Sequence, residues 1–592
     1  MKKALYIIAV TLFAVSCQMD FYRSDTMTST MLKSDPSAAV YTTDGLYSMF
    51  KDVVLFEGSE YSNNTWVKHY FQMTEFRGDN LAQGRHSEDP FTEILNYTDD
   101  PTCYNLGYFW YISYKILFGA NSNIEAIQEG SSNEGDLLLG ENYFLRAFVH
   151  FALANIYARP YYVEGRPSNA DQPCVVLRTS TDCSKTEKAT VGQVYDQVEA
   201  DCKKAYDLLK GKSRRGNKGF VGEEAPLALL SRLYLYKGDW DECINISAQL
   251  LGDDPASHLD TDLAGYFANA QTSKETIWCI NRSINDYQYS QHAQLGSMYY
   301  SSNGVGGIGW CEIYCSEPLV DLLYRWPDEG RRKAYFAYAA PIEGQLMVSW
   351  PEKPDGTHDY RLNVMITSSK GDSGYTPNVT DNGDGTFTAK SGSSTYTIHT
   401  LVDHKDTKYY ITGYETDAED QDDITGGTRV FLRTAQDNAK GTRLTMPAYM
   451  VSKFTGQDGE ELLSSNVFFR YGETILNVAE AYAHKNDPVN AIKYMNMTRS
   501  RAGLSGEALY TTTNLADSGY DNVLDAVIDE RRLELFYEGF RQLDLYRNGK
   551  EVNRHYAGEH KWEIITLDDL DAKFPAHIPY AETASSGLTS NK

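Results

Sequence analysis

The chain has 592 residues, with 55 Lys and Arg against 81 Asp and Glu, which gives a formal net charge of −26. This charge repels phosphate backbones and argues against nucleic acid as a partner. The length is sufficient for a large hydrophobic core and two to four domain-sized units. Beyond the first residues, no apolar run approaches the roughly 20 residues that a helix needs to span a bilayer.

The amino terminus has the pattern of an export signal. Lys2 and Lys3 precede an apolar run from Ala4 to Ala14, and Cys17 follows at the expected cleavage point. The segment resembles a bacterial lipobox, although Ala14 stands where a lipobox has leucine. The resemblance implies cleavage before Cys17 and lipidation of that cysteine. A plain signal peptide with a chance cysteine is the alternative.

Seven segments carry apolar residues at helical spacing. They are Leu106–Gln128, Leu137–Tyr157, Val191–Leu209, Ala225–Tyr236, Trp240–Leu251, Val467–His484 and Val489–Arg501. Thr190 is the expected N-cap of the third segment. The last four form two pairs, each with a short polar turn, and these pairs resemble tetratricopeptide repeats, which bury their apolar stripes by stacking. The two pairs lie far apart, which predicts a helical scaffold with a large insertion.

The predicted insertion extends from about Asp253 to Ser465 and is rich in Gly, Asp, Ser, Thr and Tyr. Within it, Tyr375–Val379 and Phe387–Lys390 flank turn residues and predict a β-hairpin. Loops on a rigid scaffold often carry binding sites. We therefore expect four segments: a signal peptide at 1–16, an N-terminal helical region at 17–252, a loop-rich ligand-binding insertion at 253–465, and a C-terminal helical region at 466–592.

Motifs for catalysis or cofactors are weak. Gly304–Gly309 matches GxGxxG, but it does not join a strand to a helix, so we interpret it as a flexible loop that brings Trp310 to the surface. Glu530, Glu534 and Glu538 follow at four-residue spacing among arginines, which predicts an ion-paired helix surface. Paired carboxylates of a glycosidase are the alternative interpretation.

Eight cysteines remain apart from Cys17. Cys202 and Cys243 lie in apolar helical patterns and are expected to be buried thiols. Cys174 and Cys183 flank a loop and could form a disulfide. No CxxC pair and no His/Cys cluster has the spacing of a zinc site, so we predict no metal and no cofactor.

The C-terminal sequence resembles the signature of the SusD/RagB family. It consists of Val527–Arg541 (VIDERRLELFYEGFR) followed by Asp544–Arg547 (DLYR). Other stretches agree with it along nearly the whole chain: Arg470–Tyr482, Asn496–Leu504, Glu75–Asn80, Phe574–Pro575 and Ile578–Pro579.

This resemblance implies a mostly α fold, in which tetratricopeptide-like helix pairs form an α-α superhelix beneath an irregular ligand face. It implies a lipoprotein on the cell surface, anchored to the outer membrane through Cys17. Family members capture glycan, close over a SusC-like TonB-dependent transporter and are not enzymes. The same scaffold binding peptides or another non-sugar nutrient remains the alternative.

A sugar site needs flat aromatic rings and a few polar groups, because sugars have apolar C–H faces and hydroxyl edges. The family's contact regions map onto two segments of this chain. The candidate ligand-binding residues are Asp79, Asn80, Arg85, Tyr299, Tyr300, Trp310 and Tyr314, with Trp326 and Trp350 as secondary candidates. We expect Trp66, Trp110, Trp240 and Trp278 to lie in the core.

Overall fold

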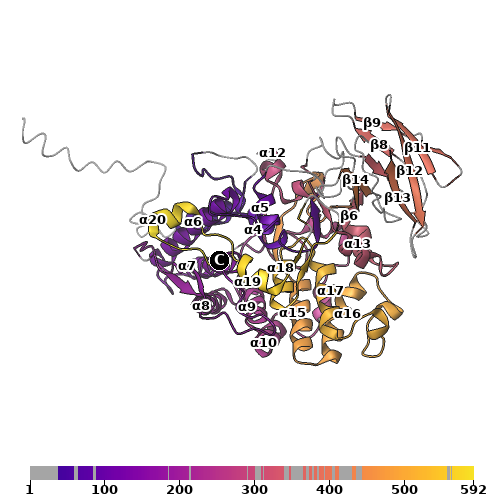
Figure 1. The fold of residues 1–592 in the computed structure, drawn as a ribbon. Helices are drawn as coiled ribbons and strands as arrows, with labels where there is room; N and C mark the ends of the chain where they lie inside the picture. Colours follow the sequence, from indigo (N-terminus) through magenta and orange to yellow (C-terminus); the bar gives the residue numbers. More distant parts are fainter. Residues whose placement is uncertain are drawn as a thin grey trace, which may run out of the picture.

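Stacked helices form the body of the protein, and two small β-sheets lie to one side of it (Figure 1). This arrangement is seen in a computed structural model that describes residues 38–58, 64–83, 89–184, 186–212, 215–289, 291–300, 309–310, 312–338, 449–556, 560–561 and 563–591. Between 346 and 447 it describes the strands given below and residues 382 and 384. The fold is mostly helical, as the sequence predicts.

The helices of the body follow one another along the chain with short connections. Their bounds are α3 Ala38–Lys51, α4 Trp66–Glu75, α5 Phe91–Leu95, α6 Tyr104–Ala126, α7 Asn133–Tyr157, α8 Val191–Leu209, α9 Glu224–Lys237, α10 Trp240–Leu251, α11 Leu263–Tyr266, α12 Ile284–Tyr289, α13 Glu317–Tyr324, α14 Gly330–Tyr335, α15 Tyr471–His484, α16 Pro488–Arg501, α17 Val523–Leu535, α18 Arg541–Arg547, α19 Leu567–Lys573 and α20 Tyr580–Ser586.

The helices form one continuous stack across the gap in the sequence. Helices α6, α7, α8, α9 and α10 pack in chain order, and α10 then packs on α15, which packs on α16 and α17. The two repeat-like pairs are therefore neighbours, although a long segment separates them along the chain (Figure 1). Stacking lets each pair bury its apolar face on the next, which confirms the predicted scaffold.

Local capping explains several helix ends. The Thr190 side chain accepts from the Gln193 backbone N–H, and the Gln193 side chain accepts from the Thr190 backbone, so α8 starts with a complete capping box. Helix α9 ends at Gly238, whose φ of 74° is left-handed, and Asp239 then caps α10. These signals place the ends of α8 and α10 where the sequence predicts them.

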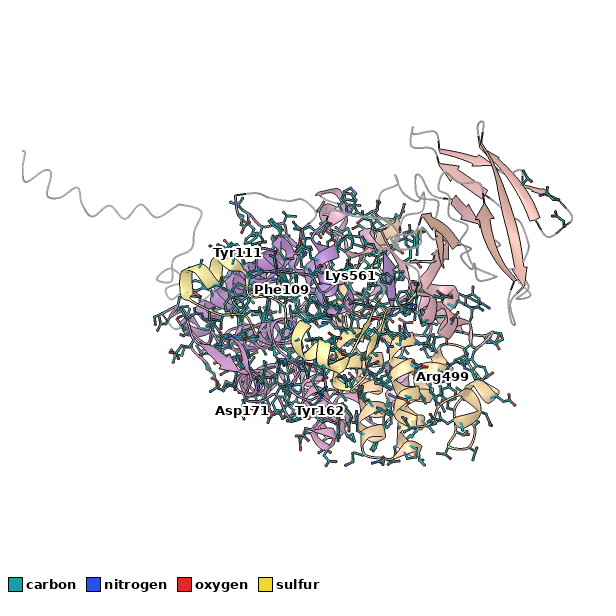
Figure 2. The ribbon with its side chains drawn as sticks, in the orientation of Figure 1. Phe109, Tyr111, Tyr162, Asp171, Arg499 and Lys561 are labelled. Carbon is teal, nitrogen blue, oxygen red and sulfur yellow. The ribbon has the colours of Figure 1, made fainter. Side chains whose placement is uncertain are left out.

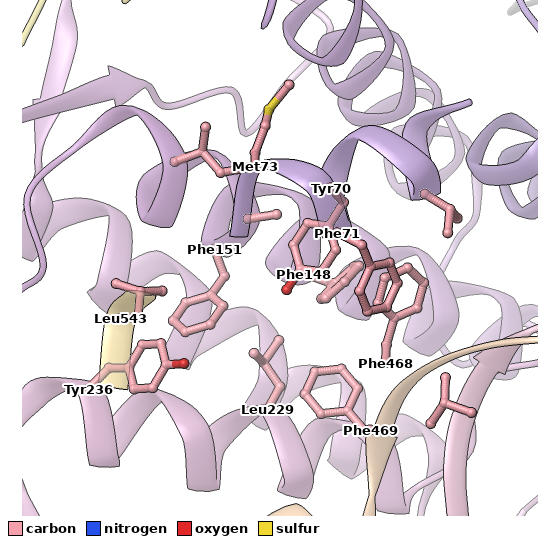
Figure 3. Close-up of a cluster of buried hydrophobic side chains, with 14 of the residues drawn as sticks. Tyr70, Phe71, Met73, Phe148, Phe151, Leu229, Tyr236, Phe468, Phe469 and Leu543 are labelled. Atoms are coloured by element: carbon pink, nitrogen blue, oxygen red, sulfur yellow. The ribbon is translucent and has the colours of Figure 1, made fainter. Parts of the chain in front are cut away.

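An aromatic cluster fills the centre of the helical body. Figure 3 shows Tyr70 and Phe71 of α4 facing Phe148 of α7 and Phe468 of the C-terminal region. Trp66 and Trp278 have no exposed surface, and Trp110 is also buried, whereas Trp240 is half-buried. Three of the four tryptophans expected in the core are therefore fully inside it.

One predicted helix begins later than expected. Residues Asn466–Arg470 form strand β17, which pairs with β4, Thr276–Ile280, and only then does α15 begin at Tyr471. A continuous run of buried apolar residues such as Val467–Phe469 fits a strand and a helix equally well, so the pattern does not decide between them. The disulfide that the sequence left open between Cys174 and Cys183 is not formed, because Cys174 is a buried free thiol and Cys183 an exposed one. Cys202 and Cys243 are buried, as predicted.

The segment predicted as an insertion consists of two parts. Residues up to Tyr335, and again Val451 and Phe454, contribute to the main core. The two larger sheets belong to the part between β6, Phe336–Tyr338, and β16, Tyr449–Val451. Strands β10, Val379–Asp381, and β11, Thr386–Ser391, form an antiparallel hairpin about the predicted turn, but the predicted first strand, Tyr375–Val379, overlaps β10 only at Val379. Strand β16 pairs with β6, so the two ends of the sheet-bearing part meet.

The sheets themselves are short and antiparallel. One has the order β10-β11-β12-β13 and the other β15-β14-β7-β8-β9. The remaining bounds are β1 Leu81–Gln83, β2 Pro173–Val176, β3 Lys188–Thr190, β5 Ile313–Cys315, β6 Phe336–Tyr338, β7 Leu346–Val348, β8 Val364–Thr367, β9 Ser373–Thr376, β10 Val379–Asp381, β11 Thr386–Ser391, β12 Ser394–Val402, β13 Thr407–Thr412, β14 Val430–Thr434, β15 Arg443–Pro447, β16 Tyr449–Val451, β18 Val552–Asn553 and β19 Ile564–Ile565.

A buried ion-pair network, here called the Glu534 network, joins α17 to the rest of the body. Its side chains are Arg331, Lys453, Arg470, Arg499 and Arg501 with Glu275, Glu329, Glu530, Glu534 and Glu538. Basic and acidic members are equal in number. Arg499 belongs to α16 and is labelled at the right of the body in Figure 2. The glutamates expected on a helix surface are therefore ion-paired, as predicted, but buried.

Candidate functional site

The structure brings together the two segments that contain the predicted site residues. Strands β1 and β5 pair antiparallel, with Ala82 opposite Tyr314 and Gln83 opposite Ile313. Trp310 precedes β5 and Asp79 precedes β1. Arg85 follows β1 but lies outside the described residues, as do Trp350 and Cys17. The pairing places these two segments side by side although they lie far apart in the sequence.

Asp79 and Asn80 are buried inside the protein rather than at its surface. The Asp79 carboxylate accepts from Arg541 Nε at 2.6 Å and Nη2 at 3.0 Å. Asn80 accepts from Arg532 Nε at 2.8 Å. Although burial alone would raise it, Arg532 and Arg541 hold the pKa of Asp79 at about 2. We therefore correct their assignment: these side chains connect two signature segments and are not exposed to a ligand.

Glu75 completes this connection. Its carboxylate accepts from the backbone N–H groups of Tyr537 at 3.1 Å and Gly539 at 3.0 Å, and from Asn80 Nδ2 at 2.8 Å. Gly539 has φ of 86°, and a Cβ at this position would collide with the Thr74 side chain. The chain therefore needs glycine here, and the resulting loop presents its N–H groups to Glu75.

The ionisation of Glu75 is expected to make the free energy of unfolding depend on pH. Burial raises the pKa of Glu75 from 4.5 to about 7, although its hydrogen bonds oppose this shift. The folded state then holds the proton more tightly than the unfolded state. This stabilisation, on the order of 3 kcal/mol, is complete below pH 4.5 and is lost as the pH rises through the folded pKa.

In urea titrations at pH 4.5 to 8, Glu75→Gln should flatten the decline in unfolding free energy seen for wild type. Glu551→Gln, an exposed control, should keep it, and an equal decline in both variants would contradict the assignment.

The three tyrosines do not share one environment. Tyr299 and Tyr314 have no exposed surface, and the Tyr299 ring packs edge-on against Tyr537 with centroids 4.7 Å apart. We correct both assignments, because a ring without exposed surface has no face for a sugar. Tyr300 is half-buried beside Leu462 and Leu463. Trp326, a secondary candidate, packs half-buried against the C-terminal core.

Trp310 lies against a neighbouring ring, and we call Trp310 and His292 together the Trp310 platform. Its ring is half-buried and packs on His292, with centroids 4.5 Å apart and planes inclined by 38°. His292 belongs to the 3₁₀ turn η3, Gln291–Ala293, and its backbone carbonyl accepts from Lys68 Nζ at 3.3 Å and Ser297 Oγ at 3.0 Å. These two hydrogen bonds hold the turn in place. The His292 ring of this turn in turn supports the indole.

The charge state of His292 suits this packing. Burial, with a further contribution from the Lys68 ammonium, lowers the pKa of His292 below its ordinary value of 6.5. The imidazole is therefore neutral at neutral pH. A neutral ring packs against indole without introducing a buried charge, so the platform retains its apolar character.

A polar hollow lies next to the same turn. Its volume is about 340 Å³, and its lining residues are Lys51, Asp52, Val53, Arg282, Asn285, Asp286 and Ala293. We call it the Arg282 hollow. Ala293 directly follows His292, so the hollow and the Trp310 platform share η3. In Figure 1, α12, which supplies Asn285 and Asp286, lies at the upper edge of the body.

Sequence reasoning did not find this hollow. Its residues come from the end of α3, the end of β4 and α12, and none belongs to a recognisable motif. The only local signal is Arg282-Ser283-Ile284-Asn285-Asp286, a polar run directly after a buried strand.

A second hollow, of about 140 Å³, lies elsewhere and is more apolar. Trp110, Tyr114 and Phe118 of α6 line it, together with Glu582 and Ser586 of α20. Tyr111, on the same helix, is also exposed and lies near the upper left of the body in Figure 2. This hollow shares no residue with the Trp310 platform or the Arg282 hollow.

The described part of the chain lacks two features, a membrane-spanning helix and a metal-binding cluster. No helix there is long and apolar enough to cross a membrane. No group of three or more His, Cys, Asp or Glu side chains there is arranged to hold a metal ion.

Comparisons with known proteins agree with this architecture. A model described as the SusD family matches residues 274–583, and a model described as "Starch-binding associating with outer membrane" matches residues 27–235. A protein of stacked helices with small antiparallel sheets is thus the class that fold and sequence define together. Since the first model covers more than half of the chain, the chain belongs to the SusD family.

Individual relatives are distant in sequence. SusD-like protein P2 of Formosa agariphila is 22% identical over 478 residues, which are 79% of this chain and 76% of that protein. SusD-like protein P38 of the same organism is 22% identical, covering 81% of this chain and 80% of that protein.

Solved structures share the fold. A SusD superfamily protein from Bacteroides thetaiotaomicron superimposes with a TM-score of 0.63 at 18% identity, covering 94% of this chain and 99% of that one. A laminarin-binding SusD-like protein superimposes with a TM-score of 0.57 at 17% identity, covering 94% and 98%.

Proposed function

We propose that this protein binds a glycan at the Trp310 platform and the adjoining polar surface. The observation that carries the proposal is the half-buried indole held on neutral His292 next to a polar hollow. A ring held in one orientation binds a sugar face without first losing conformational freedom. The starch-binding description of the matching family model and the laminarin-binding structural relative support a carbohydrate ligand.

The protein acts, on this proposal, as a cell-surface lipoprotein of the outer membrane. Lipidated Cys17 is its anchor, and it delivers captured oligosaccharide to a SusC-like TonB-dependent transporter. The outer-membrane description of the second family model supports this location. The anchor is tested by labelling cells with a clickable fatty acid. Wild type should incorporate the label and Cys17→Ser should not.

We further propose that the protein is not catalytic. The glutamates that could have formed a glycosidase pair, Glu530, Glu534 and Glu538, are buried and bonded to basic side chains. Carboxylates in such contacts have no access to a glycosidic bond. Release of reducing sugar by the purified protein would contradict this part of the proposal.

Trp310→Ala tests the binding site. We expect at least a tenfold weaker affinity for a neutral oligosaccharide, from a panel that includes starch and laminarin fragments, by isothermal titration calorimetry. The melting temperature should fall by a few degrees at most, because the indole is only half-buried.

The chain offers a matched control for this variant. Trp240 is also half-buried and stacks on a histidine, His484, with centroids 4.0 Å apart, but it lies on α10. Trp240→Ala should lower stability and leave affinity unchanged. Equal affinity of Trp310→Ala and wild type would remove Trp310 from the site. Binding of peptides but of no glycan would favour the non-sugar alternative.

A further inference from the structure

Arg282 lines the Arg282 hollow and is held in place by several hydrogen bonds. Arg282 is buried, and its Nε donates to Asn466 Oδ1 at 2.9 Å while Nη1 donates to the Lys51 carbonyl at 3.1 Å. Its backbone N–H donates to Ser465 Oγ at 3.0 Å, and its carbonyl accepts from Gln457 Nε2 at 2.7 Å. These contacts fix the guanidinium, and its Nη2 has no hydrogen-bond partner among the described residues.

Asp286, one of the lining residues, is bonded to neighbouring groups of the protein. Asp286 accepts from Lys51 Nζ at 3.0 Å and from the Ser283 N–H and hydroxyl at 2.7 and 2.8 Å. All three bonds end on Oδ2, and Lys51 Nζ also lies 3.0 Å from Oδ1, so this carboxylate is held mainly by the protein itself. Lys51 and Asp286 therefore form structure and have little left to offer a ligand.

Two other lining residues carry polar groups without such bonds. Asp52 and Asn285 are exposed, and neither side chain makes a hydrogen bond or ion pair within the described part of the chain. A carboxylate accepts two hydroxyl protons side by side, and an amide both donates and accepts. This combination matches adjacent hydroxyl groups of a sugar ring.

The charges of the hollow cancel. Lys51 and Arg282 balance Asp52 and Asp286, so the lining favours neither an anion nor a cation. At longer range, the net charge of −26 repels polyanions. A neutral, hydroxyl-rich unit meets both conditions, whereas a uronic acid adds a negative charge to a lining that already contains Asp52 and Asp286.

We infer that the Arg282 hollow is a subsite for one uncharged sugar unit of the captured glycan, with Asp52 and Asn285 reading its hydroxyls. The inference rests on the proposed glycan-binding function and adds the ligand class: neutral glycans in preference to uronate-containing ones. The shared turn η3 lets a short oligosaccharide contact the hollow and Trp310 together.

The test measures affinities of the full-length chain in detergent at 0.15 M salt. The probes are laminarin oligosaccharides, starch oligosaccharides and oligogalacturonate. Asp52→Asn and Asn285→Ala should each weaken the better neutral ligand about three- to tenfold. Asp207→Asn removes the same charge from the exposed side of α8 and should have no effect. Wild type should prefer the neutral ligand to oligogalacturonate by at least tenfold.

The outcomes separate the inference from the proposed function. If wild type binds a neutral glycan through Trp310 while Asp52→Asn and Asn285→Ala bind equally well, the hollow is not a subsite and the proposed function stands. Tighter binding of oligogalacturonate would overturn the ligand class. If wild type binds none of the glycans, the proposed function fails and this inference fails with it.

Discussion

Replacing Glu534 by glutamine is expected to lower the free energy of unfolding by about 3–5 kcal/mol. Glu534 accepts from Arg470 Nη1 at 2.6 Å and Arg331 Nη1 at 3.2 Å, and it also pairs with Arg501. Removing the carboxylate charge leaves these guanidinium groups in a buried site with less compensation. Urea unfolding at pH 7, followed by circular dichroism, measures the change.

The pKa of Glu534 points in the same direction. Burial alone would raise it, but Arg501, Arg470 and Arg331 hold the pKa of this carboxyl well below its ordinary value. A depressed pKa means that the ionised form stabilises the folded state above the unfolded pKa of about 4.5. The contribution is therefore complete at pH 7 and is lost only as the pH falls through the folded pKa.

A control lies on the same helix. Asp525 pairs with Lys550, and both side chains are about one-third exposed. Asp525→Asn should change the unfolding free energy by less than about 1 kcal/mol, because exposed ion pairs contribute little. A similar small loss for Glu534→Gln would show that the Glu534 network does not hold α17 in place.

Asp79→Asn should also be strongly destabilising, by about 2 kcal/mol or more at pH 7. The pKa of Asp79 is about 2 in the folded state against an ordinary value of 3.8, and each unit corresponds to about 1.4 kcal/mol. The variant also leaves Arg541 and Arg532 partly unpaired in the interior. Urea unfolding at pH 7 again gives the measurement.

This variant distinguishes the two roles considered for Asp79. A structural role predicts that the folded variant binds glycan with wild-type affinity at a temperature well below its melting point. The original assignment as a ligand contact predicts weaker binding with unchanged stability. Asp171→Asn, an exposed aspartate labelled in Figure 2, should change neither quantity.

The scaffold was predictable because its signals are local. Thr190 and Gln193 cap α8, and Asp239 caps α10, so both helices have the bounds that the sequence indicates. Strand β17 was missed because its pairing with β4 depends on a segment almost 200 residues earlier. Apolar periodicity carries no information about such a partner.

The candidate site was only partly predictable for a related reason. Trp310 was predicted as a ligand contact from its glycine-rich neighbours; the structure shows it half-buried, and its role as a contact stays a prediction. Asp79 and Tyr314 look like surface groups in sequence, but Arg541 and the β1–β5 pair enclose them. Burial of a polar side chain depends on distant segments, so a motif alone does not show which of its residues face solvent.

The antiparallel pair β6–β16 has an evolutionary consequence. Because this pair closes the base of the sheet-bearing part, that part leaves and re-enters the helical body at adjacent points. An exchange of everything between these strands would leave the path of the remaining chain unaltered. During evolution, the segment between β6 and β16 can therefore be replaced by one of another length without a change in the helical body.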